Sequence, residues 1–246
     1  MASFFSPVGE PITVDEFIDI YNDSYYLGNE KVVARASQNS RFVEDEIDLI
    51  LKHGIKSSVD VAKILAWKIG KIRHTESERA KKFVYASDWS GAEELSVTRY
   101  GRPFDLEGIA DFIASNIGEL GAQSISDPQG VLNRLRNQDV KGLGTVYLIT
   151  LLYFISKGRY PIYDRFATMA LYAIRNGLEP GATVRYTDLP GKESRKRFER
   201  VMDERMNPYI GDLRDIFGEK ALQSRDVDRA LWAYGHCFKR AQQVGV

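Results

Sequence analysis

Cysteine is almost missing from this chain, and its scarcity excludes several kinds of protein. Cys237 is the single cysteine among 246 residues, so no intrachain disulfide and no cysteine-rich zinc or iron–sulfur site can form. Long apolar runs are missing as well. The main charge-free apolar stretch, 145–156, falls well short of the ~20 residues that cross a bilayer, so we expect no membrane-spanning helix.

A secretory signal is also not expected. The first residues, MASFFSPVGEPIT, contain no basic segment followed by an apolar segment. With 43% hydrophobic and 28% charged residues, the composition is that of an ordinary globular protein. We therefore expect a monomer in a reducing cytoplasm.

The chain has no net charge, since 34 basic residues balance 34 acidic ones. This balance disfavours an indiscriminate binder of polyanions, but the charges are unevenly distributed. Residues 1–50 hold ten acidic and three basic residues, which leaves 31 basic against 24 acidic residues in the rest of the chain. An acidic N-terminal face on a basic body is compatible with DNA binding on one side, and equally with an ordinary solvated surface.

Apolar periodicity predicts an all-α chain. Gly54 ends one expected helix, Asp127 and Pro128 begin another as N-cap and first residue, and Ser224 caps the last. The segments 96–100 and 183–186 are too short to distinguish strands from loops. The predicted helices span 43–53, 59–72, 106–120, 128–135, 145–157, 164–176, 191–206 and 224–243.

The most informative segment is a glycine-containing turn between two of these helices, Val140-Lys141-Gly142-Leu143-Gly144. Glycines permit a positive φ and a close approach of the backbone to a ligand. The helix that begins at Thr145 then directs its N–H groups outward, where its dipole favours an anion such as a DNA phosphate. Leu143 is expected to anchor the turn in its own core. An ordinary helical hairpin is the alternative.

The residues after this turn resemble the signature of the helix-hairpin-helix DNA glycosylases. In that family an aspartate follows the hairpin, its second helix and a Gly/Pro-rich turn, and here Asp164 follows Gly158 and Pro161. Strand-cleaving members carry a lysine about 18 residues before that aspartate. The matching position is Val146, which lies 18 residues before Asp164. The resemblance covers about 127–175.

Three departures from the family pattern modify what the resemblance implies. Val146 provides no amine for a Schiff base, so a monofunctional enzyme is expected. Cys237 is alone, so the four-cysteine iron–sulfur centre of one branch is absent. Leu148 replaces a small residue and implies different local packing. No cofactor or metal is expected, although hairpins of this family can hold a monovalent cation.

The resemblance makes Asp164 the catalytic carboxylate and the hairpin residues Lys141, Gly142, Leu143, Gly144 and Thr145 the DNA contact. Cleavage of an N-glycosidic bond builds positive charge on the sugar, and a carboxylate near C1′ stabilises that charge. The alternative for Asp164 is a capping role at the start of its helix.

A flipped base needs apolar walls and polar groups that recognise its edge. On the last predicted helix, Asp228, Trp232 and His236 repeat every four residues and share a face, as in a related helix of oxidised-guanine glycosylases. Tyr147 and Tyr163, next to the motif, are further wall candidates. These side chains can equally belong to the core.

The resemblance predicts a single glycosylase-like unit, 1–246, with two helical lobes. The central lobe would span 50–163 and end in the hairpin at 127–157, and the second lobe would combine 1–49 with 164–246. The expected function is excision of a modified or mispaired base from double-stranded DNA, in repair or in defence against phage DNA with modified bases. The alternatives are a non-catalytic helix-hairpin-helix DNA-binding protein and a helical interaction protein.

Overall fold

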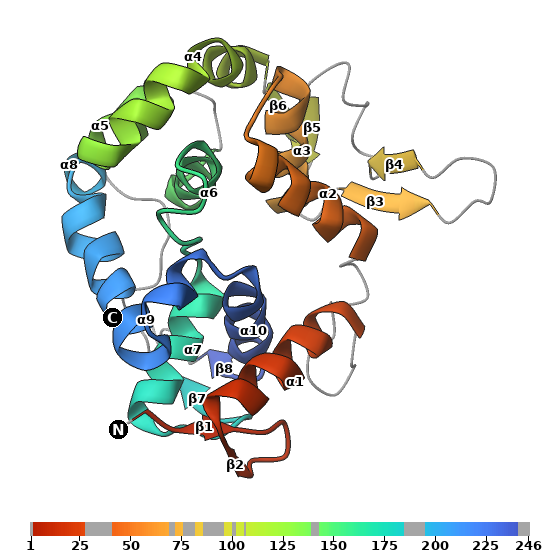
Figure 1. Cartoon of the computed structure of the whole chain (residues 1–246), viewed down its shortest axis with the longest axis vertical. Helices are drawn as coiled ribbons and strands as arrows, with labels where there is room; N and C mark the ends of the chain where they lie inside the picture. The colour runs from red at the N-terminus through yellow and green to blue at the C-terminus, as the bar shows by residue number, and fades with distance from the viewer. Residues whose placement is uncertain are drawn as a thin grey trace. The chain divides into compact units, whose positions relative to one another are not determined.

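The chain is mainly helical, as its apolar periodicity predicts (Figure 1). No helix among the described residues is long and apolar enough to cross a membrane. The computed structural model describes residues 2–27, 41–68, 72–75, 82–85, 96–99, 102–105, 107–138, 143–184 and 195–240.

The chain divides into two compact units, which we call the terminal unit (1–39, 161–190 and 206–246) and the central unit (40–160 and 191–205). The predicted central lobe spans 50–163 and differs from this division. The central unit begins at Ser40 and also includes 191–205. Hydrogen bonds explain the second difference. The Gln129 side chain donates to the carbonyl of Phe198 (2.9 Å) and accepts from the N–H of Met202 (3.0 Å), which attaches this segment to the central unit.

The terminal unit is assembled from both ends of the chain around α10, which packs against α1 and α7. Phe17, Tyr21 and Tyr234 are fully buried there, with ring centroids 4.9–5.1 Å apart. Each such ring contributes about 2 kcal/mol through burial. The elements of this unit are β1 (Phe4–Phe5), β2 (Pro11–Ile12), α1 (Val14–Leu27), α7 (Arg165–Asn176), β7 (Thr183–Val184), α9 (Asn207–Phe217), a 3₁₀ helix (Glu219–Gln223), α10 (Arg225–Gly235) and β8 (Lys239–Arg240).

The central unit surrounds α6, against which α3, α4 and α5 pack. Every residue of α6 from Leu148 to Ile155 is buried, as expected of a helix that is apolar on all sides. The elements are α2 (Arg41–His53), α3 (Ser58–Lys68), β3 (Ile72–Thr75), β4 (Lys82–Tyr85), β5 (Ser96–Arg99), β6 (Arg102–Asp105), α4 (Glu107–Ser126), α5 (Pro128–Arg136), α6 (Thr145–Ile155), α8 (Arg195–Phe198) and a π-helical turn (Met202–Met206) that leads into the terminal unit.

Several predicted element boundaries are wrong. The helix predicted over 59–72 ends at Lys68, and Ile72 begins a strand. Two antiparallel hairpins, β3–β4 and β5–β6, interrupt the predicted all-α chain; their strands have four residues each, too few for a periodic signal. The helix predicted over 224–243 ends at Gly235, because the chain then turns and β8 pairs in parallel with β7.

Two helices of the terminal unit were not predicted, α1 and α9. The start of α1 nevertheless has a recognisable capping box: the Thr13 N–H donates to a Glu16 carboxylate oxygen at 2.8 Å, and the Glu16 N–H donates to Thr13 Oγ1 at 3.3 Å. The sequence signal for the start of α9 is Pro208, because proline is common in the first turn of a helix.

Candidate active site at the start of α7

Asp164 is the N-cap residue of α7. Its backbone is extended (φ −140°, ψ 173°), and its Oδ1 accepts hydrogen bonds from the N–H groups of Phe166 (2.9 Å) and Ala167 (3.0 Å). The side chain is only 8% exposed and lies at the positive end of the helix dipole, which favours negative charge there. The capping role considered for Asp164 is therefore real, and both cap bonds use Oδ1.

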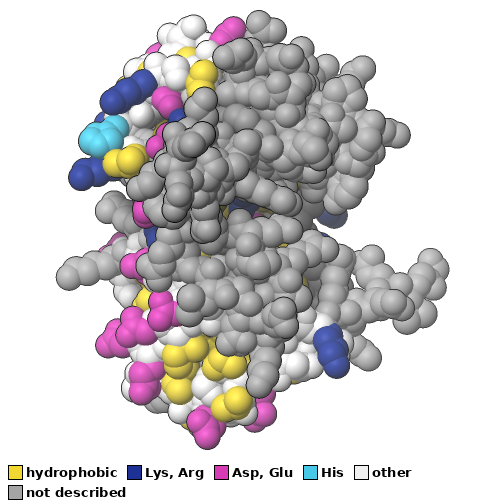
Figure 2. All heavy atoms as spheres, turned by 90° about the vertical axis from the view of Figure 1, so that its right-hand side faces the viewer, with side chains coloured by type: hydrophobic (Ala, Val, Ile, Leu, Met, Phe, Trp, Pro, Cys, Tyr) yellow, Lys and Arg dark blue, Asp and Glu magenta, His cyan; other side chains and the backbone are white. Residues whose placement is uncertain are grey.

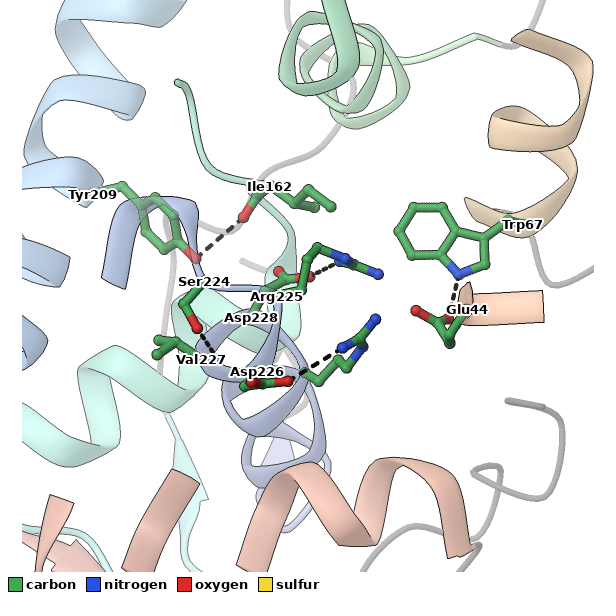
Figure 3. Close-up of polar contacts among 10 residues, drawn as sticks. Glu44, Trp67, Ile162, Tyr209, Ser224, Arg225, Asp226, Val227 and Asp228 are labelled. Carbon is green, nitrogen blue, oxygen red and sulfur yellow. Dashed lines mark hydrogen bonds and ion pairs between the residues drawn. The ribbon is translucent and has the colours of Figure 1, made fainter. Parts of the chain in front are cut away.

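The segment that leads to Asp164 is fixed by α9. The Tyr209 hydroxyl donates to the carbonyl of Ile162 at 3.2 Å (Figure 3). The rings of Tyr209 and Tyr163 pack edge to face with centroids 5.1 Å apart. Burial raises the pKa of Tyr209 well above 10, and the nearby carboxylates of Asp228 and Asp164 raise that pKa further. The hydroxyl therefore stays protonated and able to donate.

The first turn of α10 carries two ion pairs. Arg225 pairs with Asp228, and Arg229 pairs with Asp226 at 3.3 Å (Figure 3). Both guanidinium groups are largely buried, with side chains 7% and 5% exposed. The Ser224 hydroxyl caps the helix by accepting from the N–H of Val227. Asp228 is thus a partner of a buried cation, and like Asp164 it raises the pKa of Tyr209.

Aromatic side chains connect the last turn of α10 with the first turn of α7. His236 stacks on Phe166 with ring centroids 3.5 Å apart, and Trp232 lies 4.0 Å from His236 and 5.9 Å from Phe166. A base inserted between two rings needs about 7 Å between them, twice the contact distance of about 3.5 Å. His236 and Phe166 therefore cannot enclose a base between them in this arrangement, and only the outer faces of these side chains are suited to stacking.

Gly235 makes this close crossing possible. A Cβ atom at Gly235 would lie 2.1 Å from the carbonyl oxygen of Phe166, a distance at which the two helices would have to separate. The absence of a side chain at this one position thus brings α10 against the residues that follow Asp164.

The hairpin residues lie in the central unit, and the structure describes part of them. Gly144 is the N-cap of α6 and makes no side-chain cap bond, while Leu143 is half-buried and Thr145 is buried. Gly144 does not use the positive φ that glycine permits, since its φ is −84°. Lys141 and Gly142 lie outside the described residues.

The residues predicted to form a base pocket are divided between the units. Tyr163, Asp228, Trp232 and His236 belong to the terminal unit and lie on or beside α7 and α10. Tyr147 is half-buried on α6 of the central unit. Trp232 also contacts Tyr25 of α1, with ring centroids 5.2 Å apart, so this tryptophan is packed from two sides.

Three residues of the site were not predicted: Tyr209, Arg225 and Phe166. Arg225 precedes Asp228 by three residues on one helix, a spacing that places opposite charges side by side, so its pairing was recognisable. Phe166 lies two residues after Asp164. Tyr209 lies 45 residues after Asp164, and no local pattern connects the two.

Within the described ranges, no group of three or more His, Cys, Asp or Glu side chains is arranged to hold a metal ion. Burial raises the pKa of the Cys237 thiol to about 12, so the thiol stays protonated and is a poor nucleophile at neutral pH.

Comparison with known proteins finds no family model that matches the chain, and no match among curated proteins or solved structures. The assignment of a function therefore depends on the residues themselves.

Proposed function

We propose that this protein is a monofunctional DNA N-glycosylase that removes a modified or mispaired base and leaves an abasic site. The observation that carries the proposal is the buried Asp164 carboxylate at the start of α7, which lies 18 residues after Val146, the position that a lysine occupies in the strand-cleaving helix-hairpin-helix glycosylases. The residues around it provide the charge and the apolar surface that base excision requires.

In the proposed reaction the C1′–N bond of the flipped nucleotide breaks and the base leaves with the bonding electrons. Positive charge develops on the sugar, and the Asp164 carboxylate stabilises it. A water molecule then forms the new C1′–O bond and loses its proton, while the departing base gains one. We assign the charge of the Asp164 carboxylate, which is buried and held at the start of α7, to the sugar and the water.

DNA binding is assigned to the start of α6. Gly144 has no side chain that could cap α6, and the Tyr147 N–H donates to the Gly144 carbonyl at 3.0 Å, so the N–H groups that we assign to phosphate are those of Thr145 and Val146. Phosphate contacts of this kind position a duplex without reading its sequence. The α1 surface is unsuited to this role, since its exposed acidic side chains repel phosphates: Asp15, Glu16, Asp19 and Asp23. In the lower half of Figure 2, acidic side chains likewise surround a small hydrophobic group.

The experiment is a screen of the purified protein for abasic sites on a panel of duplexes with oxidised, alkylated, mispaired and bulky modified pyrimidine bases. We expect release of at least one base and product strands that break only after heat or alkali, because Val146 offers no amine. Borohydride should trap no covalent complex. Efficient trapping would contradict the monofunctional assignment. Tight binding without any release would favour the alternative, a non-catalytic helix-hairpin-helix DNA-binding protein.

A further inference from the structure

We propose that Tyr209 is a positioning residue for Asp164: by holding the carbonyl of Ile162, it fixes the extended segment that presents the carboxylate to the sugar. The inference rests on the proposed glycosylase function. Asp164 is the last of four buried residues, 161–164, that connect the turn after α6 to α7. The placement of its carboxylate therefore depends on the contacts of the residues before Asp164, as well as on the cap bonds from Phe166 and Ala167, which follow it.

Tyr209 contacts this segment in two ways. Its hydroxyl donates to the Ile162 carbonyl at 3.2 Å, and its ring packs edge to face on Tyr163, the residue directly before Asp164. Tyr209 itself is 5% exposed and lies in the first turn of α9. A backbone carbonyl in such a place has no water to replace a lost donor, so removal of the hydroxyl leaves it unsatisfied.

The electrostatic surroundings connect the same hydroxyl to the site. Besides burial, which is the main cause, the groups that raise the pKa of Tyr209 are Asp228, Asp164, Tyr163 and Asp212. The phenol is thus close enough to sense both carboxylates of the candidate site, and it stays neutral over the whole pH range in which a glycosylase works. Its role is to donate a hydrogen bond and not to transfer a proton.

Two other tyrosines provide matched controls in the same unit. The Tyr21 hydroxyl donates to the carbonyl of Phe5 at 3.0 Å, and the Tyr234 hydroxyl donates to the carbonyl of Leu178 at 3.1 Å. Both tyrosines are fully buried, and neither carbonyl belongs to the segment that carries Asp164. Tyr→Phe at each position removes one hydroxyl and keeps the ring, so the three variants differ mainly in which carbonyl loses its donor.

The test compares Tyr209→Phe with Tyr21→Phe and Tyr234→Phe. The first measurement is single-turnover base release from the duplex on which the wild type is most active. A displacement of about 1 Å at a reacting group costs up to about 100-fold in rate, so we expect Tyr209→Phe to slow release at least tenfold while its Kd for unmodified duplex stays within twofold. The controls should release the base within about threefold of the wild-type rate. Equal rates for all three variants would overturn the proposal.

The second measurement needs no substrate: exchange of the amide hydrogens of Phe166 and Ala167, which donate to Asp164 Oδ1, followed by NMR. Tyr209→Phe should accelerate both by at least tenfold over the control variants. Tyr163→Leu removes the ring contact with Tyr209 and keeps the Tyr209 hydroxyl. It should also accelerate the exchange of the two amide hydrogens. If the wild type releases no base from any duplex, the proposed function fails and this arm alone decides whether Tyr209 fixes Asp164. Unchanged exchange in both variants would overturn the positioning role.

Discussion

At the residue scale, the ion pairs of the terminal unit differ in how strongly the fold depends on them. Asp228 is 21% exposed and pairs with Arg225, whose side chain is 7% exposed. Glu219 is 73% exposed and pairs with Arg214, whose side chain is 50% exposed. Removing one partner of a buried pair leaves an uncompensated charge, whereas an exposed carboxylate is largely screened by water. Asp228 therefore has a structural role whether or not it also contacts a base.

This difference predicts the stabilities of two alanine variants. Asp228→Ala should lower the free energy of unfolding by about 3 kcal/mol, because the Arg225 guanidinium loses its buried partner. Glu219→Ala, which breaks the exposed pair with Arg214, should cost less than about 1 kcal/mol. Urea denaturation of both variants measures the difference. Equal losses would show that Asp228 is no more important to the fold than an exposed surface charge.

The sequence was enough to single out Asp164 as a catalytic candidate and as a helix cap, because its spacing to the hairpin and its place before a helical segment are local properties. The structure confirms the capping role. Tyr209 and the Phe166–His236 stack were beyond such reasoning, since each depends on how α9 and α10 pack against α7. Packing between segments that are distant in the sequence leaves no periodic signal in either of them.

At the element scale, α7 and α10 owe their close crossing to a single missing side chain. Gly235 faces the carbonyl of Phe166, so the first turn of α7, which Asp164 caps, is in direct backbone contact with the last turn of α10. A glycine in a helix is unfavourable unless packing requires it, so Gly235 is a sign of close packing. Helix periodicity does not show which segment packs there.

Gly235→Ala should therefore be destabilising although alanine favours helices. The added methyl must displace backbone, which costs about 2 kcal/mol or more. Gly211 in α9 is the control: a Cβ atom there meets nothing within 4 Å, so Gly211→Ala should be neutral or stabilising by up to about 1 kcal/mol. The midpoints of chemical denaturation report both effects. A Gly235→Ala protein as stable as the wild type would show that α7 and α10 are not in close contact.

The start of α6 offers a prediction about DNA that is separate from folding. A Cβ atom at Gly144 meets nothing within 4 Å, and its φ is ordinary, so Gly144→Glu should fold normally. The new carboxylate should repel phosphate and weaken binding to all duplexes alike, by about tenfold at low salt.

Gly118→Glu is the matched control, since Gly118 is an exposed position of α4 with equally open space and the charge change is identical. Salt titrations of DNA affinity compare the two variants. If both lower the affinity to the same extent, the effect is one of total charge, and the start of α6 is not the contact.

At the scale of the whole molecule, the terminal unit is built from three separate stretches, so α1 packs on α10 although some 200 residues lie between them. The two-lobed division was predicted from the family resemblance, but the boundaries at Ser40 and at 191–205 were not. They depend on contacts such as those of Gln129 with Phe198 and Met202, which join segments about 70 residues apart. Local propensity predicted most helices; it contains no information on which unit each of them joins.

The proposed function requires that the negative charge of Asp164 acts on the sugar in addition to capping α7. Asparagine caps helices about as well as aspartate, so Asp164→Asn preserves the two hydrogen bonds from the N–H groups of Phe166 and Ala167 and removes the charge. Asp127→Asn makes the same change at the N-cap of α5, where Asp127 accepts from the N–H of Gly130 at 2.8 Å.

The decisive measurement is the single-turnover rate of base release by Asp164→Asn, with Asp127→Asn as the control and the melting temperatures of both recorded. We predict that Asp164→Asn loses at least about 1,000-fold in rate, as expected when about 4 kcal/mol of transition-state stabilisation is removed. It should keep DNA affinity within about tenfold and melt within a few degrees of the wild type, and Asp127→Asn should release the base at the wild-type rate. Undiminished release by Asp164→Asn would contradict the account and leave Asp164 as a helix cap alone.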